Sequence, residues 1–282
     1  MRSAYFGFVA LVVFAWPSLA SADLLSDIKA NGALRLAVRQ DAPPFSSKND
    51  KGDYVGYSVA LCRAVAEDIK KQLDLSALKV ELVPVTAEDR LKAIAEKKAD
   101  LLCEATSVTL TRRAELDFSI PTFVSGAGLA IREGGPADFK ALAGHKIGVL
   151  GGTTTEEALK NSLSEQKIKA DVVPAKSHDE GLAALEDGSV DAYFADRTIL
   201  RYRLAARKSP MKLLLSENYL TIEPYALGLP LGENSFRIAV DRSLSKLYRS
   251  GAIVKLFRES FGKDAKPTAL QKALYTISGL PE

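Results

Sequence analysis

The chain has 282 residues, and its 38 basic and 35 acidic residues give a formal net charge of only +3. This length suits one or two domains, and a balanced charge without a basic run argues against nucleic acid as a partner. The two histidines and two cysteines do not match a usual structural zinc site, so we expect neither a bound metal nor a cofactor.

The N-terminus carries the three parts of a secretory signal peptide. Arg2 precedes an apolar run over residues 5–16, and residues 20–22, Ala-Ser-Ala, match an A-x-A cleavage site. The run is shorter than the about 20 residues that a membrane span needs, although a retained anchor is the weaker alternative. We predict that residues 1–22 are removed and that the mature chain begins near Asp23. No cysteine lies directly after the cleavage site, so lipid anchoring is not expected.

Short apolar runs alternate with amphipathic segments along the chain, which is typical of an α/β protein whose sheets are covered by helices. The pattern in the first half predicts helices over Leu24–Asn31, Val59–Leu73 and Glu88–Lys97, and strands over Ala33–Val38, Leu78–Val85, Asp100–Cys103 and Val124–Ile131. After the turn Gly134-Gly135-Pro136 it predicts strands over Lys146–Leu150, Ile168–Val173, Asp191–Ala195, Met211–Leu215 and Tyr225–Leu229, and helices over Thr155–Leu163, His178–Leu185, Arg197–Ala206, Ser235–Tyr248 and Ile253–Phe261.

The segment 100–123 carries the groups of a carboxylate receptor. Ser107 and Thr109 place hydroxyl groups on an extended stretch, and Arg112 follows at the start of a helical turn. A guanidinium fork fits a carboxylate, and a helix start adds free N–H groups and a positive dipole end. A capped surface helix with solvated arginines explains this segment about as well.

Several motifs, taken in order, resemble those of the family 3 periplasmic solute-binding proteins of amino-acid ABC importers, and most of all their glutamate/aspartate-binding branch. The resemblance covers roughly residues 23–262. The matching motifs are the segment just described with Asp117-Phe118-Ser119 and Phe123 after it, the loop Arg39–Ser46, the helix entry Gly56-Tyr57-Ser58, the loop Gly151–Glu156, the strand Val190–Asp196 and the return segment Glu223-Pro224-Tyr225.

The resemblance implies a two-lobed periplasmic binding protein of type II, in which each lobe is a mixed sheet flanked by helices. Lobe 1 would contain residues 23–129 and 218–282, and lobe 2 residues 130–217. Two crossings, near Ser125–Ile131 and Asn218–Leu227, would act as a hinge. It further implies a monomer without catalytic residues that binds an amino acid in the periplasm and delivers it to a membrane permease.

The same resemblance assigns the groups that hold the ligand's α-amino acid part. Arg112 would bind the carboxylate, and Asp196 the ammonium. Phe45 would cover the aliphatic part, although packing within its own lobe is the commoner role for a lone phenylalanine. Asp196 and the threonines Thr153 and Thr154 have an alternative role, which is to cap the helix that begins directly after them. The hydroxyl donors expected beside the carboxylate are Ser107, Thr109, Thr153 and Thr154.

Arg39, Arg90 and His178 lie where the glutamate/aspartate-binding branch holds the distal carboxylate of its ligand. Glu104 and Ala105 depart from that pattern, because the branch usually has glycine and serine there. A carboxylate at Glu104 repels an acidic ligand unless an arginine neutralises it. We therefore predict glutamate, aspartate or a close polar analogue, and a diamino or amide-bearing acid if Glu104 faces the ligand.

The branch often has cysteines at the positions of Cys62 and Cys103, so the resemblance implies a disulfide between them. Two separately buried thiols are the alternative.

Two other functions remain open at this point. Some periplasmic dehydratases resemble these binding proteins, and Glu104 would then be a general acid. No nucleophile–base pair supports this alternative. No membrane or signalling segment is visible near the C-terminus, which argues against a sensor ectodomain, whereas a soluble protein that feeds a sensor stays possible.

Overall fold

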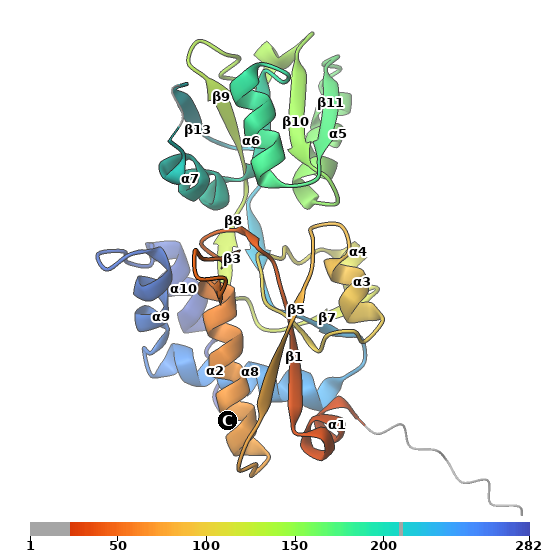
Figure 1. Cartoon of the computed structure of the whole chain (residues 1–282), viewed down its shortest axis with the longest axis vertical. Coiled ribbons are helices and arrows are strands. Elements are labelled where there is room, and N and C mark those ends of the chain that lie inside the picture. Colours follow the sequence, from red (N-terminus) through yellow and green to blue (C-terminus); the bar gives the residue numbers. More distant parts are fainter. Residues whose placement is uncertain (1–22, 209–210) are drawn as a thin grey trace, which may run out of the picture.

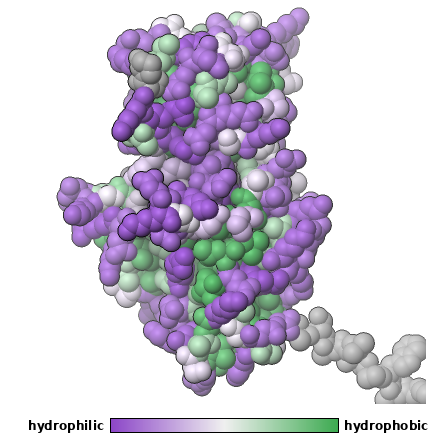
Figure 2. Space-filling model, in the orientation of Figure 1, coloured by the Kyte–Doolittle hydropathy of each residue, from purple (hydrophilic) through white to green (hydrophobic). Residues whose placement is uncertain are grey.

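The computed structural model describes residues 23–208 and 211–282, so the predicted signal peptide lies outside the described residues. The chain forms two bodies, each built on a five-stranded sheet with helices on its faces (Figure 1). Lobe 1 is the body on the first sheet and contains both ends of the described chain; lobe 2 is the body on the second sheet. Figure 2 shows the two lobes meeting at a junction lined with polar residues on the visible face.

The sheet of lobe 1 has the strand order β5-β1-β6-β15-β7. β1 runs parallel to β5 and β6, whereas β15 is antiparallel to β6 and β7. The chain therefore returns from lobe 2 to complete this sheet. The strands are β1 (Ala33–Val38), β5 (Lys79–Pro84), β6 (Leu101–Leu102), β7 (Leu116–Phe118) and β15 (Gly228–Pro230), beside a small sheet of β2 (Asp41–Ala42), β3 (Ser46–Lys48) and β4 (Tyr54–Val55).

Helix α2 (Tyr57–Gln72) shows why the helices of lobe 1 form where they do. Leu61, Val65 and Ile69 follow one another at helical spacing and are fully buried against the sheet and α8. The other helices of this lobe are α1 (Leu24–Asn31), α3 (Arg90–Ala95), α4 (Leu110–Arg113), α8 (Asn234–Arg249), α9 (Ile253–Phe261) and α10 (Ala269–Ser278). Within the described ranges no helix is both long and apolar enough to cross a membrane.

The sheet of lobe 2 has the order β11-β10-β12-β9-β13. Its three parallel strands β10, β11 and β12 end at the same edge, which faces lobe 1 (Figure 1). Its elements are β9 (Ala127–Arg132), β10 (Lys146–Leu150), β11 (Asp171–Ala175), β12 (Ala192–Asp196), β13 (Leu213–Tyr219), the short 3-10 helix η1 (Lys140–Leu142), and the helices α5 (Thr154–Glu165), α6 (His178–Asp187) and α7 (Arg197–Ala206).

Two antiparallel strands, β8 (Phe123–Ser125) and β14 (Glu223–Tyr225), carry the chain between the lobes. The second sheet reaches a few residues past the predicted limits of lobe 2 at both ends. It does so because Tyr219 at the end of β13 still pairs with Gly128 of β9.

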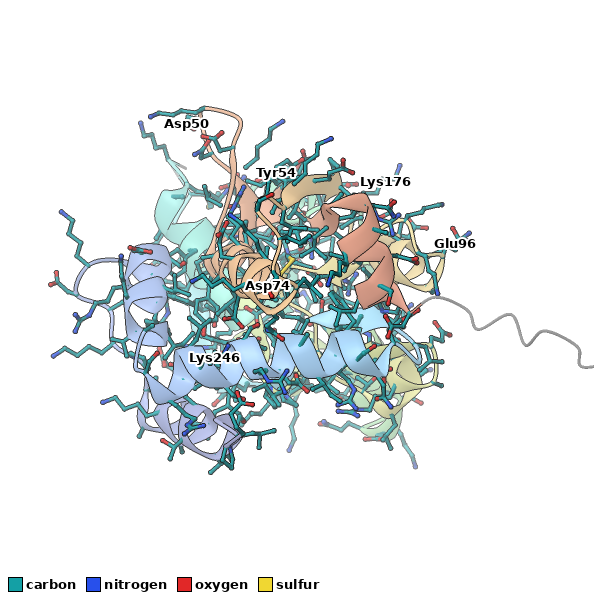
Figure 3. The ribbon with its side chains drawn as sticks, turned by 90° about the horizontal axis from the view of Figure 1, so that it is seen from below. Asp50, Tyr54, Asp74, Glu96, Lys176 and Lys246 are labelled. Atoms are coloured by element: carbon teal, nitrogen blue, oxygen red, sulfur yellow. A yellow bond between two sulfur atoms is a disulfide. The ribbon has the colours of Figure 1, made fainter. Side chains whose placement is uncertain are left out.

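The predicted disulfide is confirmed. Cys62 of α2 is bonded to Cys103, which directly follows β6, with their Cα atoms 6.0 Å apart. Figure 3 shows the bond inside lobe 1, whereas labelled charged side chains such as Glu96 and Lys246 lie on the outside. The bond ties α2 to the strand end that leads into Glu104.

We expect replacement of both cysteines by serine to lower the free energy of unfolding by about 2–4 kcal/mol, because the bond closes a long loop in the unfolded chain. Urea unfolding of the oxidised protein and of the double variant measures this difference. An unchanged midpoint with an unchanged slope would contradict the expectation.

Candidate functional site

A cavity lies where the strand ends of lobe 2 meet the loops of lobe 1. Both lobes contribute polar and apolar side chains to its wall. The lining residues are Arg39, Arg90, Ala105, Ser107, Arg112 and Tyr225 from lobe 1, and Leu150, Thr153, Thr154, Thr155, His178, Ala195, Asp196 and Ile199 from lobe 2.

Direct contacts across the cavity hold the lobes together, so this structure is a closed arrangement. The hydroxyl groups of Ser107 and Thr154 lie 3.2 Å apart. Arg90 Nη1 donates to the carbonyl oxygen of Gly152 at 3.4 Å, and Gly152 has a φ of +70° that favours glycine in this turn. A Cβ atom at Gly152 would also press on the backbone of lobe 1 near Ala87.

Arg112 lies on the lobe 1 side of the cavity and is nearly buried. Its Nη1 donates to the carbonyl oxygen of Ser107 at 2.9 Å, and Thr109 caps the helix by accepting from the Arg112 backbone N–H at 3.1 Å. The rest of the guanidinium has no hydrogen bond to another described residue. Held by its bond to Ser107, the side chain presents its remaining N–H donors to the cavity.

The start of α5 forms the facing wall. Thr153 caps this helix, because its hydroxyl oxygen accepts from the Glu156 N–H at 3.2 Å. Thr154 donates to a carboxylate oxygen of Glu223 at 2.7 Å. Thr153 therefore caps the helix and lines the cavity at the same time. The positive end of the α5 dipole adds to the charge of Arg112 in this cavity.

Asp196 ends β12 and is a buried carboxylate at the cavity wall. One oxygen accepts from the Ile199 N–H at 2.7 Å, so the predicted capping role exists, and the other accepts from the Tyr225 hydroxyl. Burial raises the pKa of Asp196, and hydrogen bonds from Ser125 and Tyr225 oppose that rise. A cation bound beside this group would favour its charged form.

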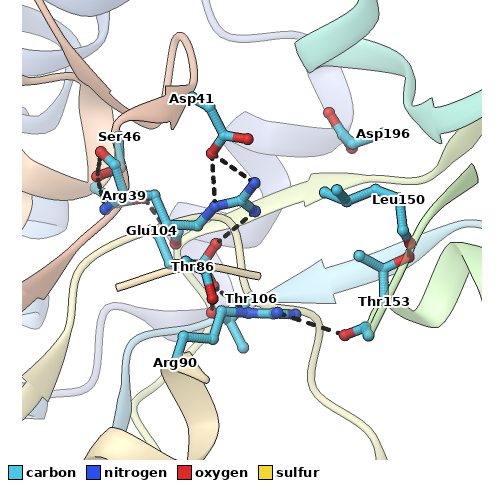
Figure 4. Close-up of polar contacts among 12 residues, drawn as sticks. Arg39, Asp41, Ser46, Thr86, Arg90, Glu104, Thr106, Leu150, Thr153 and Asp196 are labelled. Carbon is cyan, nitrogen blue, oxygen red and sulfur yellow. Dashed lines mark hydrogen bonds and ion pairs between the residues drawn. The ribbon is translucent and has the colours of Figure 1, made fainter. Parts of the chain in front are cut away.

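Arg39 and Arg90 line the cavity on its lobe 1 side and share one acidic partner, Glu104 (Figure 4). Arg90 Nε lies 3.1 Å from Glu104 Oε1, and Arg39 Nη1 lies 3.5 Å from Glu104 Oε2. Arg39 also donates through Nε and Nη2 to Asp41 Oδ1, at 3.0 and 2.7 Å. Burial lowers the pKa of Arg90 to about 10, although Glu104 acts against that shift. Thr106 donates a further hydrogen bond to Glu104.

His178 begins α6 and is buried at the cavity wall. Its Nδ1 lies 3.1 Å from the hydroxyl oxygen of Tyr193, whereas its buried Nε2 has no hydrogen-bond partner among the described residues. Burial lowers the pKa of His178 to about 3, the charge of Arg39 adds to this effect, and Asp41 opposes it. The imidazole is therefore neutral near pH 7 and adds no positive charge to the cavity.

Three residues that the sequence assigns to the ligand do not line the cavity. Phe45 is fully buried in lobe 1, where its ring packs edge-on against Phe123 and Tyr225 at 5.0 and 5.6 Å. Phe45 therefore packs within its own lobe, which is the alternative role. Burial of its ring among other aromatic rings is more favourable than contact with a polar cavity. Thr109 caps α4, and Glu104 lies behind the two arginines that it pairs with.

Six more residues line the wall without a ligand contact predicted for them from the sequence: Ala105, Leu150, Thr155, Ala195, Ile199 and Tyr225. Leu150 ends β10 and Ile199 lies in the first turn of α7. Tyr225 stands in the return segment that the resemblance already marked, so its aromatic ring was the one available signal. Leu150 and Ile199 could not be identified from the sequence, because apolar residues are common at the ends of parallel strands and in the helices that follow them.

Two lobes that close over a polar cavity, one presenting a guanidinium and the other a carboxylate, define a two-lobed binding protein of type II. Residues 34–263 match the family described as bacterial extracellular solute-binding proteins, family 3, and the chain belongs to this family.

Several relatives are similar over most of their length. The L-glutamate/L-aspartate-binding protein of Pseudomonas aeruginosa is 29% identical, over 87% of this chain and 82% of the relative. The glutamate/aspartate import solute-binding protein of Escherichia coli K12 is 29% identical, over 89% and 83%.

Solved structures agree on the fold. The solute receptor for L-cysteine of Neisseria gonorrhoeae superposes with a TM-score of 0.75 at 23% identity, over 86% of this chain and 97% of the receptor. An ancestral amino-acid-binding protein, described as a precursor of cyclohexadienyl dehydratase, has a TM-score of 0.73 at 26% identity, over 84% and 99%.

We expect the NMR signals of the His178 ring to stay unchanged between about pH 5 and pH 8, because its pKa lies far below the usual 6.5. The unfolded chain takes up this proton near its ordinary pKa and the folded chain does not. His178 therefore contributes to stability above about pH 6.5, and that contribution is lost as the pH falls toward about 3.

The chain has only two histidines, so a His145→Gln variant assigns the signals. A His178 ring that titrates between about pH 5 and pH 8 would contradict the buried, neutral state.

Proposed function

We propose that this protein is the periplasmic substrate-binding component of an amino-acid ABC importer and that it binds a polar α-amino acid between its lobes. The observation that carries the proposal is the position of Arg112 and Asp196 on opposite walls of one closed cavity, in different lobes. An α-amino acid has one carboxylate and one ammonium group. Each would be paired in this cavity, as burial of charges requires.

The named relatives support the ligand class. Those from Pseudomonas aeruginosa and Escherichia coli are named for glutamate and aspartate, which share the α-amino acid group and a short polar side chain. The predicted signal peptide and the family together support a periplasmic location. Delivery to a membrane permease and a monomeric state complete the proposal, and they follow from the resemblance to this family.

An enzymatic role is the second candidate, because one similar structure is described as a dehydratase precursor. A general acid must come within hydrogen-bond reach of the reacting atom. Glu104 faces Arg39, Arg90 and Thr106 instead of the cavity. We therefore propose binding without turnover. Conversion of a prephenate-like acid by the purified protein would favour the enzyme.

Thermal denaturation with each L-amino acid in turn, followed by small-angle scattering, tests the proposed function. An amino acid that binds the folded state at about 100 times its Kd adds roughly 2.7 kcal/mol to stability. We expect that amino acid also to lower the radius of gyration, because binding would shift the molecules in solution from open arrangements toward the closed arrangement described here. No stabilisation by any amino acid, or an unchanged radius at saturation, would count against the proposal.

Replacement of Arg112 by alanine should weaken binding of that amino acid about 10- to 150-fold, equivalent to roughly 1.5–3 kcal/mol, because the carboxylate loses charge-assisted hydrogen bonds. Calorimetry measures the change. Arg113→Ala is the matched control, since Arg113 is exposed on the same helix and should bind like the wild type. Near wild-type affinity of a folded Arg112→Ala protein would refute the assignment.

A further inference from the structure

The arginines that the resemblance assigns to a ligand's distal carboxylate already have acidic partners in this chain. Arg39 donates to Asp41 and lies close to Glu104, and Arg90 pairs with Glu104 while it also donates to Gly152 (Figure 4). Glu104 is fully buried, so solvent does not weaken these ion pairs. Its carboxylate and that of Asp41 balance the two positive charges that an acidic ligand would need.

The formal charges of this subsite cancel. The two guanidinium groups of Arg39 and Arg90 stand against the two carboxylates of Asp41 and Glu104. Arg203 of α7, which donates to the Asp41 carbonyl oxygen outside the cavity wall, is paired with Asp179 at 2.9 Å and adds no free charge. A further carboxylate buried here would be an uncompensated negative charge, which is costly.

His178 supplies one specific contact that remains, beside the buried Glu104 Oε2, which also has no hydrogen-bond partner among the described residues. Its Nε2 is buried, lies on a cavity-lining side chain and has no hydrogen-bond partner among the described residues. Nδ1 lies beside the hydroxyl of Tyr193, which can donate or accept, so Nε2 can be either an acceptor or a donor. A carboxamide or hydroxyl satisfies Nε2 in both cases, whereas an ionised carboxylate can only accept.

We propose that the side-chain subsite of this protein takes a neutral, hydrogen-bonding side chain, such as a carboxamide, in preference to a carboxylate. The inference rests on the proposed function and names its ligand class more narrowly. It also departs from the glutamate or aspartate that the sequence analysis predicts. In this proposal the Glu104 carboxylate pairs with Arg39 and Arg90 in place of the distal carboxylate of an acidic ligand.

Calorimetry with two ligand pairs of matched shape tests the inference: L-glutamine against L-glutamate, and L-asparagine against L-aspartate. We expect the better-binding pair to show at least about a tenfold preference for the amide near neutral pH, because the two members differ mainly in charge. The Glu104→Gln variant keeps the shape of the side chain and removes its charge. It should move the acid-to-amide affinity ratio about tenfold or more toward the acid.

Two further variants make the result specific. Asp41→Asn should move the ratio in the same direction, and it replaces Glu104→Gln as the test if that variant does not fold, because Asp41 is less buried. Asp100→Asn is the matched control. It removes the charge of a similarly buried carboxylate, which pairs with the partly exposed Arg35 of β1 away from the cavity, and should leave the ratio unchanged.

The outcomes separate this inference from the proposed function. Wild-type protein that binds the acids as tightly as the amides, or an unchanged ratio in folded Glu104→Gln and Asp41→Asn proteins, would overturn the inference and leave the proposed function standing. Tightest binding of an apolar amino acid such as leucine would overturn it as well, together with the polar ligand of the proposed function, and would leave only the role as an amino-acid-binding protein. If no amino acid binds at all, the proposed function itself fails.

Discussion

The pairing of buried charges is the constraint on which the site depends. Arg39, Arg90, Arg112, Glu104 and Asp196 are all nearly inaccessible to solvent, and an unpaired charge in such a place is costly. The first two arginines are held by Glu104 and Asp41, whereas Arg112 and Asp196 face each other's lobe with only hydrogen bonds to neutral groups. This difference in pairing is the reason we propose a ligand with one negative and one positive group at one end only.

The architecture makes this distribution possible because it brings backbone and side chains from distant parts of the sequence to one place. In lobe 2, the parallel strands β10 and β12 end at one edge, so the helix starts after them present Thr153 and Asp196 together. Each of these residues caps its own helix and lines the cavity. The caps fix the side chains before any ligand arrives, which reduces the entropy that binding would otherwise cost.

Much of this arrangement could be predicted from the sequence, since local patterns determine it. The order of strands and helices follows from hydrophobic periodicity, and the hydroxyl, arginine and aspartate positions follow from motifs at strand ends. Eight of the eleven predicted ligand residues line the cavity. The short strands β2, β3 and β4 and helix α10 were not predicted, because two- and three-residue strands carry no period and the C-terminal pattern is interrupted by polar residues.

The sequence left two roles open for Phe45 and for Glu104, and it could not decide between them because both positions depend on contacts between segments far apart in the chain. Phe45 lies in the core because Phe123, Tyr225 and Phe261 gather around it. Glu104 lies behind Arg39 and Arg90 because β1 and β6 are neighbours in the sheet. A list of cationic residues taken from the sequence favours an acidic ligand. The pairing seen in the structure shows that a charge count has meaning only after each charge has been assigned its partner. In this cavity that assignment leaves Arg112 and Asp196 with hydrogen bonds to neutral groups alone, which is why we propose these two for the α-amino acid group.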